Sequence, residues 1–486
     1  MVGGSRTHNL CLRRAALYPI ELRPRVRGAR NPGQTPAQRT RDATIAPADR
    51  QTRMAAHPSP ASTASRTTPL WAVLLFTFLN SIGSGIVYSG IFFIAESVYR
   101  FDSTKNFLLG LLYGVTYIPA AYFCGGIQRK LGAIGISPRG MLAMQMILMA
   151  AACSLPWIVQ RFVPGGREGG GGEWAIWVAI ALYSPLSGTL WPVVESFLAG
   201  GRTEAQLRAS IGKFNVCWSS SIVVTLLAIS PLIERHALAT LPILAVVHVL
   251  CIGVLIAFRT QPGAHAHHEH VASENSKSLL EFLRYMLPTA FMFIATLSPY
   301  LPSALTRLGV EPDYKTALAA TWLAARVLTF LALERWHGWH GRWSTPIGGG
   351  FILLGAFAAV VIGPLFFTGT AGLIALLIGL AGFGVGIGII YACALYYAME
   401  VGSSGVDAGG THEALIGVGY TAGPLCGLIA IGAAGRTPVG ADRSDLLMLA
   451  LVSLVALLVG GAALAKARRH LKQRARTPTD AAPSRI

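Results

Sequence analysis

Twelve apolar stretches, each long enough to cross a membrane, recur along this chain between Pro69 and Ala465. A helix of about 20 apolar residues spans the hydrocarbon core of a bilayer. Backbone N–H and C=O groups find no water there, so only helices and closed barrels can span it. The short alternating stretches of a membrane barrel are absent from the sequence. We therefore expect an all-α membrane protein with spans at 70–97, 106–125, 139–158, 174–199, 211–232, 240–259, 282–303, 315–334, 347–368, 372–399, 411–434 and 445–465.

The composition supports this class of protein. Of the 486 residues, 53% are hydrophobic and only 13% are charged, about half the charged fraction that is usual in a soluble protein. Most of the net charge of +18 lies at the two ends of the chain, in residues 1–68 and from Lys466 onward. Basic ends beside membrane spans fit a membrane lipid with an anionic headgroup. No basic fold interleaved with aromatic residues accompanies this charge, so we expect no nucleic-acid partner.

Changes of composition divide the chain into five parts. An Arg-rich N-terminal segment has no apolar period and is predicted to be disordered, with Met54 as an alternative translation start. Two sets of six spans follow, separated by a polar linker that contains four histidines. The predicted boundaries are 1–68 for the N-terminal segment, 69–259 for the first bundle, 260–281 for the linker, 282–465 for the second bundle and 466–486 for a basic tail.

A repeat and the distribution of basic residues predict the arrangement in the membrane. Glu195 and Glu400 end corresponding spans of the two sets, and the same offset of 205 residues relates other helix pairs, such as Ile211 and Ile416. Parallel repeats of this kind place a substrate site between the halves at mid-depth. The loops hold similar numbers of Lys and Arg on both sides of the membrane, so the basic tails decide the predicted orientation. We expect a multi-pass protein of a bacterial-type inner (plasma) membrane with both termini in the cytoplasm.

Two motifs resemble the major facilitator superfamily. The loop after the second span reads Gly125-Gly126-Ile127-Gln128-Arg129-Lys130-Leu131-Gly132, with Arg129 where that family usually has Asp. Gly419 to Gly427 in the eleventh span resembles the family's Gly-x-x-x-Gly-Pro packing pattern. The resemblance implies twelve transmembrane helices in two pseudo-symmetric six-helix bundles. It also implies a secondary active or facilitative transporter that moves a small organic solute by alternating access.

Candidate substrate residues come from the resemblance and from one buried charge. In that family the first, fourth, seventh and tenth spans of the chain line the central cavity. Arg326 lies in the middle of the eighth span, where a guanidinium group must face a wet cavity or pair with an acid of another helix. Arg binds carboxylate and phosphate groups in fork geometry, so an anionic solute is one interpretation and a structural ion pair is the other. The candidate cavity residues are Asn80, Tyr88, Trp191, Tyr300, Arg326 and Tyr391.

Glu195 and Glu400 are candidate gating residues near the cytoplasmic ends of their spans. Basic side chains of the inner loops could reach them, so we expect Glu195 to pair with Arg129, Lys130 or Arg208. Glu400 is expected to pair with Arg335 or Arg342. Such ion pairs would close the cytoplasmic side, and a static charge network at the headgroup level is the alternative.

The sequence predicts no metal site and no cofactor, and it leaves coupling open. The seven cysteines have no metal-ligand spacing, and there is no phosphate-binding Gly-Lys loop. A proton-coupled transporter needs a group that titrates during the cycle. The candidates are Glu96, Glu195, Glu400, Glu413 and His248, and facilitated diffusion remains an alternative. A polytopic membrane enzyme and a transporter-like sensor are the other function classes considered, but the sequence lacks their motifs and domains, so we expect a transporter and not an enzyme.

Overall fold

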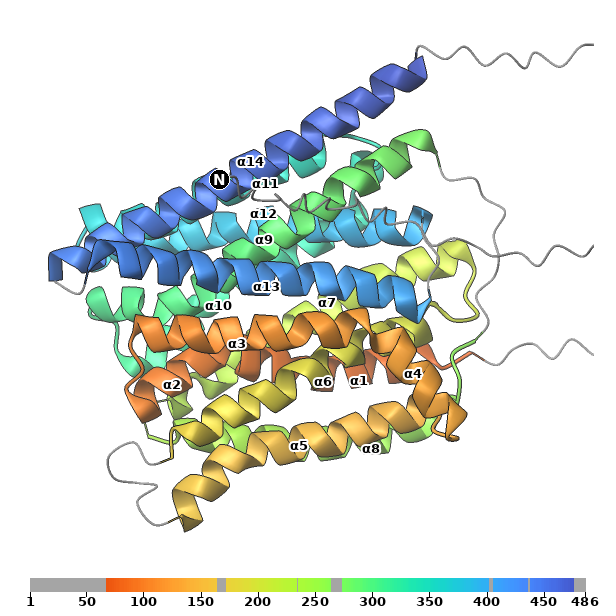
Figure 1. Cartoon of the computed structure of the whole chain (residues 1–486), viewed down its shortest axis with the longest axis horizontal. Helices are drawn as coiled ribbons and strands as arrows, with labels where there is room; N and C mark the ends of the chain where they lie inside the picture. Colours follow the sequence, from red (N-terminus) through yellow and green to blue (C-terminus); the bar gives the residue numbers. More distant parts are fainter. Residues whose placement is uncertain are drawn as a thin grey trace, which may run out of the picture. The chain divides into compact units, whose positions relative to one another are not determined.

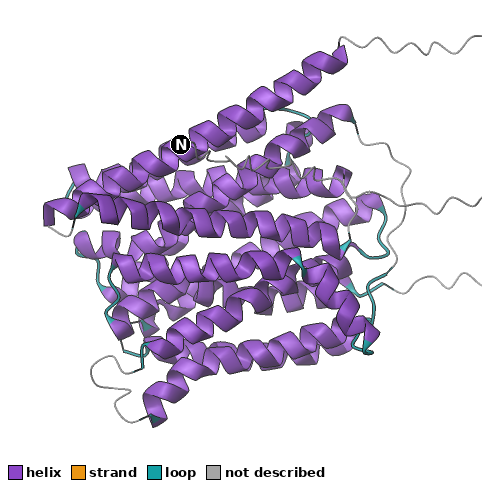
Figure 2. Cartoon of the chain, in the orientation of Figure 1, coloured by secondary structure: helices purple, strands orange, loops and turns teal. Residues whose placement is uncertain are grey.

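The computed structural model describes residues 67–163, 172–233, 235–263, 273–401, 405–435 and 438–475, which belong to one compact unit that spans Thr63–Ile486. Helices make up the regular structure throughout these ranges, and they contain no strand (Figure 2). Met54 and the four histidines of the linker lie outside the described residues. The all-α prediction is therefore confirmed for the part of the chain that carries the predicted spans.

The first set of helices covers the first six predicted spans. The first span is interrupted, and the second continues through a bend into a short polar helix. Short 3₁₀ turns flank the last two helices of the set. The elements are α1 (Leu70–Gly83), the π-helical segment η1 (Ser84–Gly90), α2 (Ile91–Tyr99), α3 (Ser103–Tyr122), α4 (Cys124–Ala133), α5 (Pro138–Phe162), α6 (Trp174–Ala199), α7 (Glu204–Ile229), η2 (Ser230–Leu232), η3 (Ala237–Ala239), α8 (Thr240–Val254) and η4 (Leu255–Ala257).

The second set covers the remaining six spans and has longer helices at its two ends. Eight residues of the predicted linker belong to its first helix, and its last helix continues past the predicted span end at 465. The elements are α9 (Glu274–Arg307), α10 (Pro312–Arg335), η5 (His337–Trp339), α11 (Ser344–Phe366), α12 (Gly369–Val401), α13 (Val406–Ala434) and α14 (Pro438–Ala475).

Eleven helices in the described ranges are long and apolar enough to cross a membrane, and a twelfth span results if α3 and α4 are counted together. These two helices meet at an angle of 55° beside Phe123. Pro119 lies in the last turn of α3, and a proline removes a backbone donor and promotes kinks. The polar helix α4 carries the exposed Arg129 and Lys130, which favours a position at the membrane surface.

Two helix pairs make the most extensive contacts between the two sets. α3 packs against α13, and α7 packs against α10; the α3–α13 pair crosses the centre of Figure 1. Each pair joins the second span of one set to the fifth span of the other, so exchanging the sets exchanges the two pairs. The linker joins the sets at the right-hand end of the bundle in Figure 1, where α8 ends and α9 begins. We call this the linker end and the opposite side the far end.

Glycines allow α13 to lie very close to α9. A Cβ atom on Gly419 would lie 2.4 Å from the carbonyl oxygen of Pro288, and one on Gly423 would lie 2.5 Å from that of Met292. These two glycines form the Gly-x-x-x-Gly pattern seen in the sequence, and small residues at such spacing let helix backbones approach each other in membranes.

Candidate functional site

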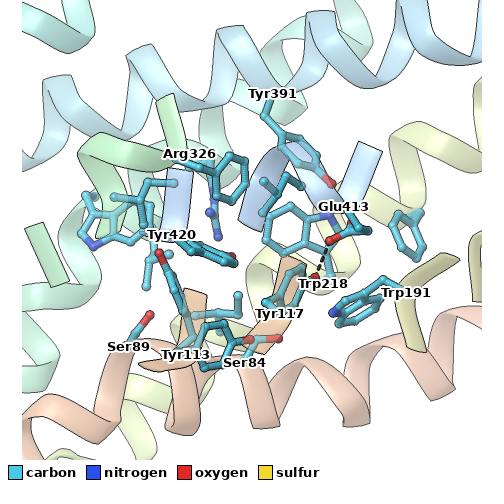
Figure 3. A pocket seen from close by; sticks show the side chains of 18 of the residues that line it. Ser84, Ser89, Tyr113, Tyr117, Trp191, Trp218, Arg326, Tyr391, Glu413 and Tyr420 are labelled. Atoms are coloured by element: carbon cyan, nitrogen blue, oxygen red, sulfur yellow. Dashed lines mark hydrogen bonds between the residues drawn. The ribbon is translucent and has the colours of Figure 1, made fainter. Parts of the chain in front are cut away.

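A buried cavity lies at the centre of the bundle, between the two helix sets. Side chains from η1, α3, α6, α7, α9, α10, α12 and α13 line it (Figure 3), whereas α5, α8, α11 and α14 do not contribute. The centre of a water-sized sphere can occupy about 80 Å³ of it, enough for roughly five to eight water molecules. The aromatic lining residues are Tyr88, Tyr113, Tyr117, Trp191, Phe214, Trp218, Phe291, Trp322, Tyr391 and Tyr420.

Arg326 reaches this cavity from α10 and has no carboxylate partner among the described residues. Its side chain is only 3% exposed, and its Nε donates to the Ser219 hydroxyl at 2.9 Å. The guanidinium carbon lies 4.4 Å from the ring centre of Trp218 and 5.0 Å from that of Trp322. Its Nη2 is buried and lacks a hydrogen-bond acceptor in the described part of the chain. Arg326 is therefore held by one serine and two indole rings, with donors left for another group.

Tyrosine rings form a second part of the lining. The ring centre of Tyr420 lies 4.3 Å from that of Tyr88 and 5.5 Å from those of Tyr113 and Tyr117. The Tyr88 hydroxyl is buried and has no hydrogen-bond partner in the described ranges. Since α3 and α13 belong to different helix sets, this aromatic cluster joins the two sets at the cavity (Figure 3).

Two carboxyl groups line the same cavity. The hydroxyl of Tyr117 on α3 donates to Glu413 on α13 (Figure 3), and Glu413 is 5% exposed. Glu195 is 8% exposed and makes no ion pair with a described side chain. Its Oε2 lies next to α13, because a Cβ atom on Gly409 would be 3.1 Å away. Gly409 is one helical turn before Glu413, so the two carboxyl groups approach the cavity from neighbouring parts of α6 and α13.

Four of the six predicted cavity residues line this cavity, namely Tyr88, Trp191, Arg326 and Tyr391. Asn80 does not, because its amide points to the sulfur of Met146 on α5, at 3.0 Å. The sequence pattern assumed an unbroken α-helix from residue 80 to 88. The π-helical segment η1 interrupts it, and the wider π turn changes the register of the side chains.

Tyr300 is the other predicted cavity residue that lies elsewhere. It follows Phe291, which does line the cavity, by nine residues, or about 14 Å along α9. Its hydroxyl accepts a hydrogen bond from Arg307 at 3.1 Å, and Arg307 forms an ion pair with Asp445 at 2.6 Å. Tyr300 therefore belongs to a contact between α9 and α14 at the far end.

None of the predicted gating pairs is formed among the side chains that the structure describes, and the Arg208 side chain lies outside them. Arg129 pairs with Asp407 at 2.8 Å instead of Glu195, and Lys130 is exposed. Glu400 accepts a hydrogen bond from the Ser276 hydroxyl at 3.1 Å. Arg335 donates to the carbonyl of Leu331 in its own helix at 3.4 Å. The bend between α3 and α4 directs Arg129 toward the start of α13, and Pro119 is the residue in the sequence that could have indicated it.

A polar network joins the two sets at the far end. Lys315 on α10 pairs with Glu96 on α2 at 3.2 Å and donates to the Thr306 hydroxyl at 2.6 Å. Thr306 in turn donates to Glu96 at 2.9 Å. The Lys315 side chain is 10% exposed, whereas the Arg129 and Asp407 side chains at the linker end are each 68% exposed. The far end is therefore closed by the more buried contact.

The remaining candidates have packing roles in this structure. His248 on α8 is buried and lies 3.2 Å from the Tyr183 hydroxyl, away from the cavity lining. Five cysteines in the described ranges are buried, and Cys217 is half-buried. No group of three or more His, Cys, Asp or Glu side chains that could hold a metal occurs among the residues described.

Comparisons with known proteins identify the fold. No protein-family profile and no curated protein matches this sequence. The structure of a mutant of the nucleoside transporter NupG matches with a TM-score of 0.59 at 12% identity, over 82% of this chain and 99% of that chain. This protein has the major facilitator fold. A bacterial homolog of the human lysosomal transporter Spinster, in an inward-facing and unoccupied conformation, matches with a TM-score of 0.57 at 14% identity, over 83% of this chain and 97% of that chain.

The major facilitator fold confirms the predicted fold class, including the two pseudo-symmetric helix sets and a multi-pass membrane protein. The described parts of the four helices that do not line the cavity, α5, α8, α11 and α14, belong to the third and sixth spans of each set. Glu413 was not among the residues predicted to line the cavity. The expected span began at 411, whereas α13 begins at Val406, so Glu413 lies deeper in its helix than the hydropathy pattern indicated.

Proposed function

We propose that this protein is a transmembrane transporter that moves a small organic solute by alternating access, with its binding site in the central aromatic cavity. The proposal rests mainly on Arg326. Its guanidinium group is buried at the interface of the two helix sets, and its Nη2 has no acceptor among the described residues. A buried cation without an anionic partner is costly in a membrane and marks a substrate pathway. The aromatic walls supply apolar contact area, as in other small-molecule sites.

The solute carries an anionic group that binds Arg326. The planar guanidinium group forms two parallel hydrogen bonds with a carboxylate or a phosphate. The indole rings of Trp218 and Trp322 hold its plane in place through cation–π contacts, so little side-chain entropy is lost when an anion binds.

Contacts between the helix sets supply the two closures that alternating access requires. At the linker end the exposed Arg129–Asp407 pair joins α4 to α13. At the far end the Glu96–Lys315–Thr306 network joins α2 to α9 and α10. Breaking one set of contacts while the other persists would open the cavity to one side only. These contacts take the gating role that the sequence assigned to Glu195 and Glu400.

The proposed location is a bacterial-type inner (plasma) membrane with the linker end in the cytoplasm. The linker end carries the basic residues of α4 and of the end of α14, including Lys130, Arg468 and Arg469. Basic residues next to spans favour the cytoplasmic side. Both facilitated and ion-coupled transport are compatible with this site. The proposed function is that of a transporter and not of a membrane enzyme or a sensor.

Uptake into proteoliposomes tests the proposal. Full-length protein is reconstituted and assayed with a panel of labelled carboxylates, phosphate esters, amino acids and neutral metabolites, and Arg326→Gln and Arg326→Lys are compared with the native protein. We expect saturable uptake of an anion-bearing solute, lost in Arg326→Gln and weakened in Arg326→Lys because Lys lacks the planar fork. Arg284→Gln, at the linker end of α9, is the matched control. Equal uptake by protein-containing and empty vesicles for every solute would contradict the proposal.

A further inference from the structure

The central cavity holds one guanidinium group and two carboxyl groups, and no ion pair joins them in the described part of the chain. Arg326 has a buried Nη2 without an acceptor, and it forms no ion pair with Glu195 or Glu413 although all three side chains line the cavity. Each of these side chains is more than nine-tenths buried. In a site screened from water, two opposite charges attract strongly. Their separation therefore leaves room for an occupant that satisfies both.

We propose that the solute is a small zwitterion, with its anionic group bound to Arg326 and its ammonium group bound to the carboxylates of Glu195 and Glu413. This inference rests on the proposed transport function and narrows its substrate class. A solute with only an anionic group would leave the two carboxylates without a cation, and a buried unpaired charge is costly. A zwitterion supplies one partner for each end of the site.

The acidic end of the cavity is built to accept an ammonium group. Glu413 receives one hydrogen bond from Tyr117, and a carboxylate has about four acceptor positions, so it can accept further donors. Glu195 has no described ion-pair partner and lies against α13 one turn from Glu413. An ammonium group has three donors, which matches two carboxylates and one further acceptor.

The space between the two ends limits the size of the solute. Rings of Trp218, Tyr391 and Tyr420 lie near Arg326 and Glu413 in Figure 3, and they give apolar walls to the middle of the cavity. The free volume of about 80 Å³ corresponds to roughly five to eight water molecules, which is about the size of an amino acid. Aromatic faces also attract cations, so they tolerate the ammonium group as well as a hydrocarbon side chain.

Matched sets of ligands test the two-ended recognition. The purified full-length protein is titrated in a thermal-shift assay with leucine, isocaproate and isoamylamine, and with phenylalanine, hydrocinnamate and phenethylamine. The other common amino acids are tested at the same concentrations. Within each set the second compound lacks the ammonium group and the third lacks the carboxylate. We expect an amino acid to raise the melting temperature more than either of its one-ended analogues.

Three substitutions assign each end. Arg326→Gln is expected to weaken amino-acid binding about 10- to 100-fold, the range for loss of hydrogen bonds to a charged group, and to leave the amine unaffected. Glu195→Gln and Glu413→Gln are expected to weaken the binding of the amino acid and of the amine, and to leave the binding of the carboxylate analogue unchanged. Glu281→Gln, which removes a carboxylate paired with Lys466 outside the cavity, is the control for general destabilisation.

Two results would overturn the inference. A carboxylate that binds as tightly as its amino acid, with Glu413→Gln changing only the pH dependence of its uptake, would make Glu413 a proton site and leave the proposed function intact. The absence of stabilisation by every amino acid tested would also refute the zwitterion. Failure of the transport function itself is a separate result, because no solute of any class would then enter the proteoliposomes.

Discussion

At the residue scale, the chemistry of the cavity depends on how Arg326 is held. Its Nε bonds to Ser219 on α7, and its guanidinium group stacks on Trp218 from α7 and Trp322 from α10. The contacts with Ser219 and Trp218 cross between the two helix sets, whereas Trp322 lies one turn before Arg326 on the same helix. A guanidinium group fixed in this way presents its remaining donors to the cavity in one orientation, which is what recognition of a planar anion requires.

Replacing Trp218 should weaken solute binding more than it weakens the fold. In Trp218→Leu the closer of the two cation–π contacts is lost, and Arg326 gains freedom to rotate. A cation–π contact away from water contributes about 0.5–2 kcal/mol, so we expect the dissociation constant to rise about 2- to 30-fold. Titration by thermal shift measures it. Trp157→Leu, at a side chain that is 38% exposed on α5, should leave the affinity unchanged, and an equal loss in both variants would argue against the stacking role.

At the scale of single elements, close backbone approach decides where α13 lies. Gly114 on α3 meets the backbone of Tyr420, and Gly423 on α13 meets the carbonyl of Met292 on α9. α13 therefore packs tightly against one helix of each set. Because Glu413 and Tyr420 are on α13, this packing also positions the acidic and aromatic parts of the cavity.

A methyl group at Gly423 should separate α13 from α9. Its Cβ would lie 2.5 Å from the Met292 carbonyl oxygen, and overpacking of this kind costs about 1–3 kcal/mol. We expect Gly423→Ala to lower the melting temperature in detergent. Gly432→Ala on the same helix is the control, because a Cβ there meets nothing within 4 Å, and alanine is favoured over glycine in a helix by about 0.5–1 kcal/mol. Equal melting temperatures for the two variants would show that the close approach carries no stability.

At the scale of the whole molecule, the two ends of the bundle differ in how firmly they are closed. The far end has a shared, partly buried network around Lys315, whereas the linker end has the exposed Arg129–Asp407 pair. Exposed ion pairs contribute little to stability, whereas removing one member of a buried pair destabilises the protein more. Of these two polar contacts, the far-end network therefore contributes more to the conformation described here.

Removing either closure should shift the balance between the two open forms. With Cys124, which lies beside the linker-end pair at the start of α4, as the sole cysteine, Arg129→Gln should increase its labelling by a membrane-impermeant maleimide. An exposed pair of about 0.2–1 kcal/mol corresponds to about a 1.4- to 5-fold increase. Lys315→Met should open the far end and lower the labelling of Cys124.

Lys277→Gln is the control for this experiment, because the described partner of Lys277 is Glu274 of its own helix, so this ion pair joins no two elements. The labelling of Cys124 in the Lys277→Gln variant should equal its labelling in the parent chain. An increase in Lys315→Met as large as that in Arg129→Gln would contradict alternating closure and indicate general loosening.

Much of this molecule follows from hydropathy and helical spacing alone. Most spans start and end near their predicted positions, since about 20 apolar residues must be helical in a bilayer whatever their neighbours are. The helices α9 and α14 extend further than predicted, because polar residues continue them beyond the apolar stretch. Arg326 could be identified for a similar reason, because a guanidinium group in the middle of a span must face a wet cavity or pair with an acid. Tyr88, Trp191 and Tyr391 required in addition the resemblance to a known family, which indicates the spans that face the centre.

Other features depend on contacts between segments far apart in the chain. Asn80 lies away from the cavity, next to the π-helical segment that begins after Gly83. The bend at Phe123 allows Arg129 to form an ion pair with Asp407, 278 residues later in the sequence. Neither a register change nor a bend leaves a mark in an apolar pattern. The sequence by itself determined the membrane class, the spans and the cation Arg326 in the middle of one span. Only the tertiary structure decided that Glu413 and Glu195 share the cavity with Arg326, because helix packing, and not local spacing, brings side chains of different spans together.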